Sequence, residues 1–181
     1  MIPHLSERAL VLAPQGRDSA VAGAILAEAG LRFEVANSVP ELVAHVREGA
    51  GFGLVTEEAL DGADLRELSG WIEGQPEWSD FPFILLTQRA WGLERNPAAA
   101  RYLEVLGNVT FLERPFHPTT LVSLAQSALR GRRRQYEARA GSRISTSLPR
   151  TSSGASRSGP QSTKWHSHSS MRRRSSRRLA S

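Results

Sequence analysis

The sequence FPFILLT at residues 81–87 is the most apolar stretch of the chain, and it decides how the rest is interpreted. Short apolar runs of this kind are typical of parallel strands that are buried on both faces of a sheet. Shorter runs of the same character occur at residues 9–13, 52–56 and 109–112. Residues 32–36 alternate apolar and polar side chains, as a more exposed strand does. The sequence therefore predicts five strands.

Helical patterns separate the predicted strands. Asp18 or Ser19 can cap a first helix, and Ser38 with Glu41 has the spacing of a capping box. Apolar stripes at helical spacing predict helices at residues 19–30, 39–49, 64–74, 97–106 and 119–139. Five strands alternating with five helices predict an α/β fold, a doubly wound five-stranded parallel sheet with helices on both faces.

Charge divides the 181 residues into two unlike parts. Residues 1–140 hold 14 arginines and 18 acidic residues, a net charge of −4, whereas residues 141–181 hold nine basic residues and no acidic one. The chain has no cysteine, which excludes disulfides, thiolate zinc sites and a cysteine nucleophile. It also lacks a run of about 18 apolar residues and a signal-peptide pattern. We therefore expect a cytoplasmic protein with no membrane contact.

The basic segment, residues 141–181, contains 14 serines and only scattered apolar residues, so we expect it to be disordered. The predicted organisation is a globular domain at residues 1–131, a charged helical extension or linker at 132–140 and this tail. Three interpretations of the tail stay open: an electrostatic binder of nucleic acid or anionic surfaces, an inert extension, or an out-of-frame translation of a GC-rich gene. The arginines that would contact phosphates are Arg172, Arg173, Arg174, Arg177 and Arg178.

The carboxyl ends of the strands are where an open α/β sheet carries its working site. The residues at these ends are Ala13-Pro14, Thr56 to Glu58, Thr87 and the segment from Glu113 to Phe116. The sequence has neither a Gly-rich dinucleotide motif nor a phosphate-binding P-loop, and its histidines have no metal-ligand spacing. A nucleotide-dependent enzyme is therefore disfavoured, and we expect no cofactor.

Two of these segments carry a resemblance to a known family. FLERPF at residues 111–116 and LLT at residues 85–87 are similar to the ends of strands five and four in response-regulator receiver domains, and the likeness extends over about residues 7–131. It implies a receiver or flavodoxin-like fold. Thr87 and Phe111 stand at the positions of the family's switch residues. Arg114 and Pro115 stand where receivers have Lys-Pro, and Thr56 or Glu57 stands at the phosphoacceptor aspartate.

The departures from that family indicate a degenerate receiver. Receivers hold Mg²⁺ with two acidic residues after strand one, where this chain has Ala13-Pro14. Mg²⁺ requires hard oxygen ligands, and phosphoryl transfer depends on the metal's charge. We therefore expect no metal, no phosphoacceptor and no enzymatic activity. An atypical phosphotransfer receiver that uses Glu57 and Glu58 for a metal is an alternative.

Structural roles are the alternatives for the remaining residues at this edge. The hydroxyl of Thr87 can be satisfied locally, and Phe111 can belong to the core. Arg114 can pair with Glu57 or Glu58 and hold strand ends together. Trp71 and Trp78 are interpreted as packing anchors of the long connection before residues 81–87.

The resemblance also implies a function. A charged helix after the domain is similar to the one that leads out of N-terminal modules of hybrid sensor histidine kinases. The expected function is a non-catalytic protein-interaction module of two-component signal transduction. Its contact surface would be residues 102–116 with the following helix, and its partner a histidine kinase or another two-component protein. The sequence leaves the partner's identity, the input signal and the oligomeric state open.

Overall fold

The computed structural model of the chain describes residues 6–88 and 97–146. The predicted nucleic-acid contacts, Arg172 to Arg174 with Arg177 and Arg178, lie outside the described residues, as do residues 147–181 generally.

Five parallel strands form one sheet in the order β2-β1-β3-β4-β5. The strands are β1 (Ala9–Leu12), β2 (Phe33–Ala36), β3 (Phe52–Thr56), β4 (Phe83–Thr87) and β5 (Val109–Glu113). Each predicted strand is present, so the predicted doubly wound sheet is confirmed. The parallel pairing brings the carboxyl ends of the strands to one edge, where Thr87 is aligned with Glu113.

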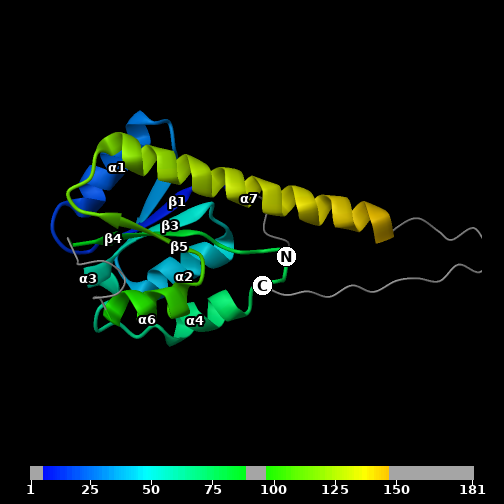
Figure 1. Ribbon diagram of the computed structural model, residues 1–181, viewed down its shortest axis with the longest axis horizontal. Helices are drawn as coiled ribbons and strands as arrows, with labels where there is room; N and C mark the ends of the chain where they lie inside the picture. The colour runs from blue at the N-terminus through cyan, green and yellow to red at the C-terminus, as the bar shows by residue number, and fades with distance from the viewer. Residues whose placement is uncertain (1–5, 89–96, 147–181) are drawn as a thin grey trace, which may run out of the picture. The chain divides into compact units, whose positions relative to one another are not determined.

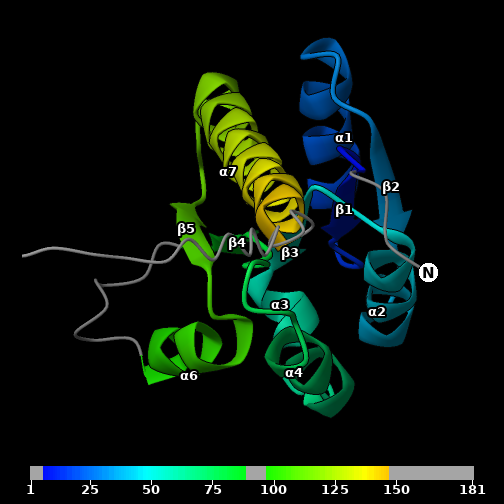
Figure 2. The ribbon, with the colours of Figure 1, turned by 90° about the vertical axis from the view of Figure 1, so that its right-hand side faces the viewer.

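Helices cover both faces of the sheet (Figure 1). They are α1 (Asp18–Glu28), α2 (Val39–Glu48), α3 (Glu57–Leu60), α4 (Arg66–Glu73), α6 (Pro97–Leu106) and α7 (Pro118–Thr146). Figure 2 shows α1 and α7 on one side, with α2, α4 and α6 on the other. The helix α2 begins as predicted, because the Ser38 hydroxyl accepts a hydrogen bond from the backbone N–H of Glu41 at 3.3 Å.

The strand β4 shows why its sequence is apolar throughout. Phe83 and Leu85 enter the core beneath α2, α4 and α6, whereas Ile84 and Leu86 enter the core beneath α1 and α7. All four are at most 1% exposed. Because successive side chains of a strand point to opposite faces, a central strand with two covered faces needs apolar residues at every position.

Gly53 allows β3 and β4 to approach closely. A Cβ atom on Gly53 would lie 2.7 Å from the ring of Phe83, which is inside van der Waals contact. The large ring on β4 therefore fills the space that the missing side chain on β3 leaves.

Several boundaries differ from those predicted. The helix α7 runs to Thr146, so the prediction of a disordered tail from residue 141 is wrong for residues 141–146. Extending an existing helix costs much less than nucleating one, so low-propensity residues can continue it. The segment 132–140 is helical, as predicted, but it is continuous with the domain's last helix and its Arg132 is buried. The strand predicted at residues 81–87 begins only at Phe83, and the four-residue helix α3 was not predicted.

None of the helices in the described ranges combines the length and apolar character that crossing a bilayer requires.

Replacing Leu85 by alanine should lower the free energy of unfolding by about 2–5 kcal/mol, because the side chain is fully buried and leaves a cavity. Urea denaturation followed by circular dichroism measures this loss. Leu103→Ala is the matched control, since Leu103 is 40% exposed, and it should change stability by less than about 1 kcal/mol. Equal losses in the two variants would contradict the described core.

Candidate functional site

Arg114 is the centre of the polar residues at the carboxyl edge of the sheet. It directly follows β5, and its side chain is 20% exposed. One terminal nitrogen of its guanidinium forms an ion pair with Asp18, and the other forms an ion pair with Glu58. Arg114 thereby joins α1, α3 and the end of β5.

The fold places these three side chains together. The backbone N–H of Arg114 donates a hydrogen bond to the carbonyl oxygen of Thr87 at 2.9 Å, which continues the pairing of β4 with β5. Asp18 is the first residue of α1, and Glu58 is the second residue of α3, which begins directly after β3. Helices that follow strands of a parallel sheet start at its carboxyl edge, so both carboxylates reach the same point.

A second donor completes the surroundings of Glu58. The side-chain amide of Gln88 donates a hydrogen bond to Glu58 Oε1 at 2.9 Å. Partial burial raises the pKa of Glu58, but the hydrogen bond from Gln88 and the ion pair with Arg114 outweigh it, so that the pKa lies below its ordinary value of 4.5. Burial similarly lowers the pKa of Arg114, and its two carboxylate partners more than reverse that shift. The contact therefore favours the charged forms of Glu58 and Arg114.

An open hollow of about 560 Å³ lies beside Arg114. Its polar lining comes from Asp18, Gln88 and Arg114, and its apolar lining includes Val21 and Phe116. The hollow is therefore bounded by the ion-paired cluster on one side and by α1 and the start of α7 on the others.

The structure distributes the predicted site residues unevenly around this cluster. Thr56 and Thr87 end their strands and are 2% and 4% exposed, so both lie beneath the edge. Glu57 starts α3, and in the described part of the chain it forms no ion pair with Arg114. Phe111 is half-buried and packs against the core beneath α6. The roles of phosphoacceptor position and switch for these four residues stay predictions.

The predicted pairing of Arg114 with Glu57 or Glu58 is confirmed for Glu58. The second partner, Asp18, was predicted only as a helix cap, and that prediction is wrong, because Arg17 occupies the N-cap position of α1 and no side chain caps this helix. The signal that could have identified this second partner is its position: the first residue of a helix that follows a strand lies at the carboxyl edge of the sheet, within reach of a long arginine side chain.

The residues at this edge do not fit the Mg²⁺ that receivers hold. After β1 stand Ala13, which is buried, and Pro14, and neither offers a side-chain oxygen. Two of the carboxylates at this edge, those of Asp18 and Glu58, are both bound to Arg114, a cation of the protein itself. No group of three or more potential metal ligands occurs among the residues that the structure describes.

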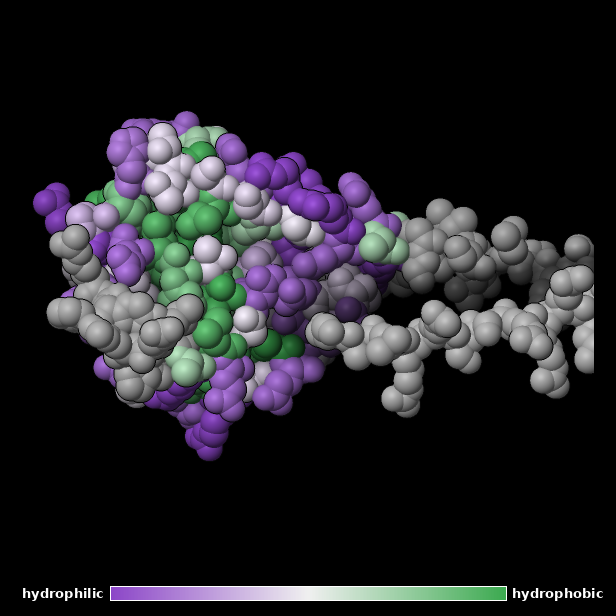
Figure 3. Space-filling view, viewed as in Figure 1, coloured by the Kyte–Doolittle hydropathy of each residue, from purple (hydrophilic) through white to green (hydrophobic). Residues whose placement is uncertain are grey.

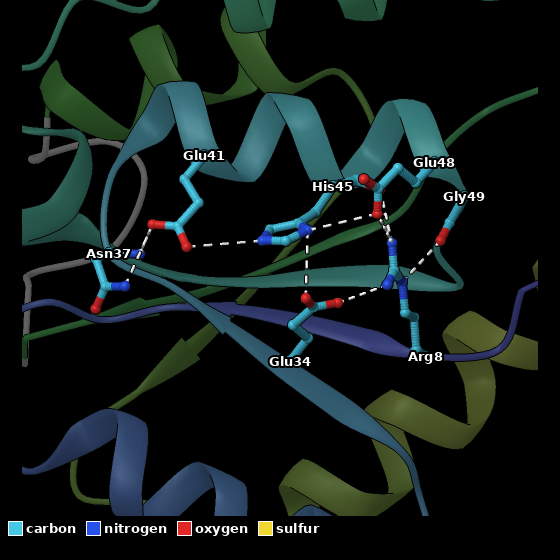
Figure 4. A network of polar contacts seen from close by, with 7 residues as sticks. All are labelled: Arg8, Glu34, Asn37, Glu41, His45, Glu48 and Gly49. Atoms are coloured by element: carbon cyan, nitrogen blue, oxygen red, sulfur yellow. Dashed lines mark hydrogen bonds and ion pairs between the residues drawn. The ribbon is translucent and has the colours of Figure 1, made fainter.

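A second polar cluster lies at the opposite, amino edge of the sheet (Figure 4). Arg8, just before β1, donates hydrogen bonds to Glu34 of β2 at 2.5 Å and to Glu48 of α2 at 3.0 Å. His45 lies between these carboxylates, with Nδ1 3.4 Å from Glu34 Oε1. The cluster links α2 to the edge strand β2, and we assign it a structural role.

The Glu58→Gln variant should lose less stability on acidification than the unmodified protein. A carboxyl whose pKa is lowered by folding stabilises the protein above its ordinary pKa of 4.5, and the contribution is lost as the pH falls below that value. The difference should be about 0.5–1 kcal/mol for this partly exposed pair. Urea denaturation from about pH 6 to about pH 3.5 measures it.

Glu28→Gln serves as the control for the acid profile, because Glu28 lies on α1, is exposed and forms no ion pair in the described part of the chain. Its profile should follow that of the unmodified protein. If the stability of Glu58→Gln depends on pH in the same way as that of the unmodified protein, the described ion pair is contradicted.

Comparison with known proteins identifies relatives of the fold only. None of the protein-family models and none of the curated proteins matches the sequence. Among solved structures, a CheY-like response regulator receiver domain protein from Methanospirillum hungatei is 18% identical, with 72% of this chain and 98% of that one covered and a TM-score of 0.56.

Two larger proteins are also similar. NtrX from Brucella abortus, solved in complex with ADP, is 19% identical with a TM-score of 0.61, and the match covers 80% of this chain but only 31% of NtrX. Full-length FixJ from B. japonicum is 21% identical with a TM-score of 0.56, covering 81% of this chain and 71% of FixJ. At these identities the likeness establishes the architecture, and the domain has the CheY-like receiver fold.

Proposed function

We propose that this domain is a receiver-like interaction module of two-component signalling that neither binds Mg²⁺ nor accepts a phosphoryl group. The observation that carries the proposal is the double ion pair of Arg114 with Asp18 and Glu58. In this proposal the guanidinium supplies the positive charge at the carboxyl edge that a metal ion supplies in phosphorylated receivers.

Electrostatics at this edge oppose phosphoryl transfer. A metal ion bound by Asp18 and Glu58 would have to displace the guanidinium of Arg114 from both carboxylates, and this partly buried cation would then lack an ionic partner, which is costly. Transfer also requires an acceptor, and the last residue of β3 is Thr56, whose hydroxyl is a weak nucleophile without a base to activate it. The domain would therefore hold one conformation without a phosphorylation cycle.

The face formed by α6, β5 and α7 is the surface that we propose for partner binding. Strand β5 pairs only with β4 and forms one edge of the sheet. Figure 3 shows apolar residues gathered over β5, between α7 and α6. The apolar side chains of these elements that retain exposure are Leu103, Val105, Val109, Phe111 and Leu124. Apolar surface that a domain leaves uncovered is typical of protein-binding sites.

The partner that we propose is a histidine kinase or another two-component protein, and we propose that the domain is a fragment of a hybrid sensor histidine kinase. The helix α7 supports this context, because it continues to Thr146, beyond the residues that cover the sheet. The share of NtrX that the chain covers shows the same fold within a longer protein.

Acetyl phosphate with Mg²⁺ should leave the protein unmodified, because no site at the carboxyl edge assembles metal, acceptor and phosphate. Intact-mass spectrometry measures the modification, and a competent receiver treated in parallel is the positive control. Stoichiometric, Mg²⁺-dependent modification within residues 56–58 would contradict the proposal and favour the atypical phosphotransfer receiver that uses Glu57 and Glu58.

The Leu103→Arg variant should weaken binding to the partner by at least about tenfold, because it places a charge within the apolar face. Binding is measured by biolayer interferometry against the purified cytoplasmic portions of the histidine kinases of the source organism. Val35→Arg is the matched control, since Val35 is 38% exposed on β2, at the end of the sheet opposite β5, and it should leave binding unchanged. Equal effects of the two variants, or no kinase bound by the unmodified protein, would count against the proposed surface and partner.

A further inference from the structure

A second cavity lies at the amino edge of the sheet, on the side away from Arg114. Its volume is about 440 Å³, within the range of about 300–1,000 Å³ that small-molecule pockets occupy. The ends of α2 and α4, the connection from α4 to β4 and the stretch of α7 from Arg132 to Arg139 contribute to its walls. Nothing in the proposed signalling function uses this cavity.

Three arginines line the cavity, and Arg132 of α7 is the buried one, only 5% exposed. Arg47 forms an ion pair with Glu67 at 3.0 Å, and the guanidinium of Arg139 lies 4.5 Å from the centroid of Trp78. One terminal nitrogen of Arg132 donates hydrogen bonds to Ser79 Oγ at 2.9 Å and to Gln135 Oε1 at 2.6 Å. Its Nε is buried and has no hydrogen-bond partner. A buried polar group without a partner costs free energy, so this guanidinium has unused capacity to bind an acceptor.

Arg132 also lacks a counter-ion. No carboxylate lies within ion-pair distance of it anywhere in the described ranges, and the neighbouring Asp80 carboxylate accepts a hydrogen bond from Asn108 at 3.0 Å instead. The carbonyl ends of α2 and α4 face the cavity at Gly49 and Gly74. Their partial charges, about half a unit per helix, moderate the buried charge but do not neutralise it.

Aromatic rings form much of the remaining wall. Trp71 and Trp78 line the cavity with Phe81 and Tyr136. The Trp78 ring lies edge-on to Tyr136, with centroids 5.2 Å apart, and the Arg132 guanidinium lies 5.1 Å from the centroid of Tyr136. Arg132 also lies 5.4 Å from the centroid of Phe81, so two rings contact its guanidinium, whereas no carboxylate does so in the described ranges. The rings of Trp71 and Trp78 therefore place apolar surface next to a positive charge that has no ionic partner.

We propose that this cavity binds a small aromatic carboxylate. The carboxylate would pair with Arg132, and the ring would pack against Trp71 and Trp78. Each feature is needed: the unpaired guanidinium selects a negative charge, the rings select a flat apolar body, and the volume admits a small molecule. The ligand would contact both α7 and the α4–β4 connection, and would stabilise the position of α7 against the domain.

A pair of probes that differ in charge alone tests the proposal on the full chain. The probes are 2-naphthoate and 2-naphthamide, with affinities measured by isothermal titration calorimetry. Naphthoate should bind at least about tenfold more tightly, because only it forms a charge-assisted hydrogen bond with Arg132. In NMR spectra, the indole N–H signals of Trp71 and Trp78 should shift on its addition. Equal affinities, no saturable binding of naphthoate, or shifts confined to other residues would overturn the proposal.

Substitution of single arginines tests whether Arg132 is the residue that causes the preference for naphthoate over naphthamide. Arg132→Met should abolish the preference for naphthoate, and Arg134→Met, an exposed neighbour on the same helix, should retain it. A preference that survives in Arg132→Met, or one that Arg134→Met loses equally, would overturn the assignment. If Arg132→Met does not fold, Trp78→Leu takes its place: it should weaken naphthoate binding at least about fivefold by removing a cavity wall, and unchanged binding would count against the site.

Discussion

The contact of Arg114 with two carboxylates is the constraint on which the carboxyl edge of this domain depends. It joins residues from three parts of the chain. Asp18 lies 96 positions before Arg114, and Glu58 lies 56 positions before Arg114. A surface ion pair contributes little alone, but a guanidinium held between two partly buried carboxylates forms a small network with defined geometry. The same contact uses the acidic groups that could otherwise bind a metal ion, and this is why we assign the edge a structural role.

In this account, the domain keeps the receiver fold without the Mg²⁺-dependent phosphorylation that the fold supports in receivers. The sheet, the helices and the threonine at the end of β4 match the architecture of receivers, whose own cycle depends on a metal and an acceptor aspartate. Here the polar groups at the edge satisfy one another. In the proposed function, such a domain presents the surface of a receiver in a single state, and its regulation comes from elsewhere. The cavity at Arg132, on the far side of the sheet and against α7, is one place where a ligand could act.

Much of the fold could be predicted from the sequence, because its strands are short apolar runs and its helices are amphipathic. The pairing of Arg114 with an acidic residue after β3 could also be predicted, because the carboxyl ends of parallel strands lie at the same edge of the sheet. The contribution of Asp18 was not predicted, because the position of this residue at the start of a helix was interpreted as a capping role, which the structure does not show.

The greatest differences from the sequence predictions concern α7. A run of arginines predicts a solvated helix, yet Arg132 is buried, because the long connection before β4 turns back and packs rings against it. Only the tertiary arrangement reveals that packing. The continuation of α7 through residues 141–146 was not predicted, because the composition of residues 141–181 as a whole disfavours helix formation. A helix that has already formed can nevertheless extend into residues that would not start one.

Titration with MgCl₂, monitored by the backbone amide signals of Asp18, Glu58 and Gln88 in two-dimensional NMR spectra, tests the central claim most directly. If Arg114 occupies both carboxylates, millimolar Mg²⁺ will produce no saturable shift beyond that of matched ionic strength with NaCl. A saturable, Mg²⁺-specific shift centred on these residues would show that the edge binds the metal, and would contradict the account.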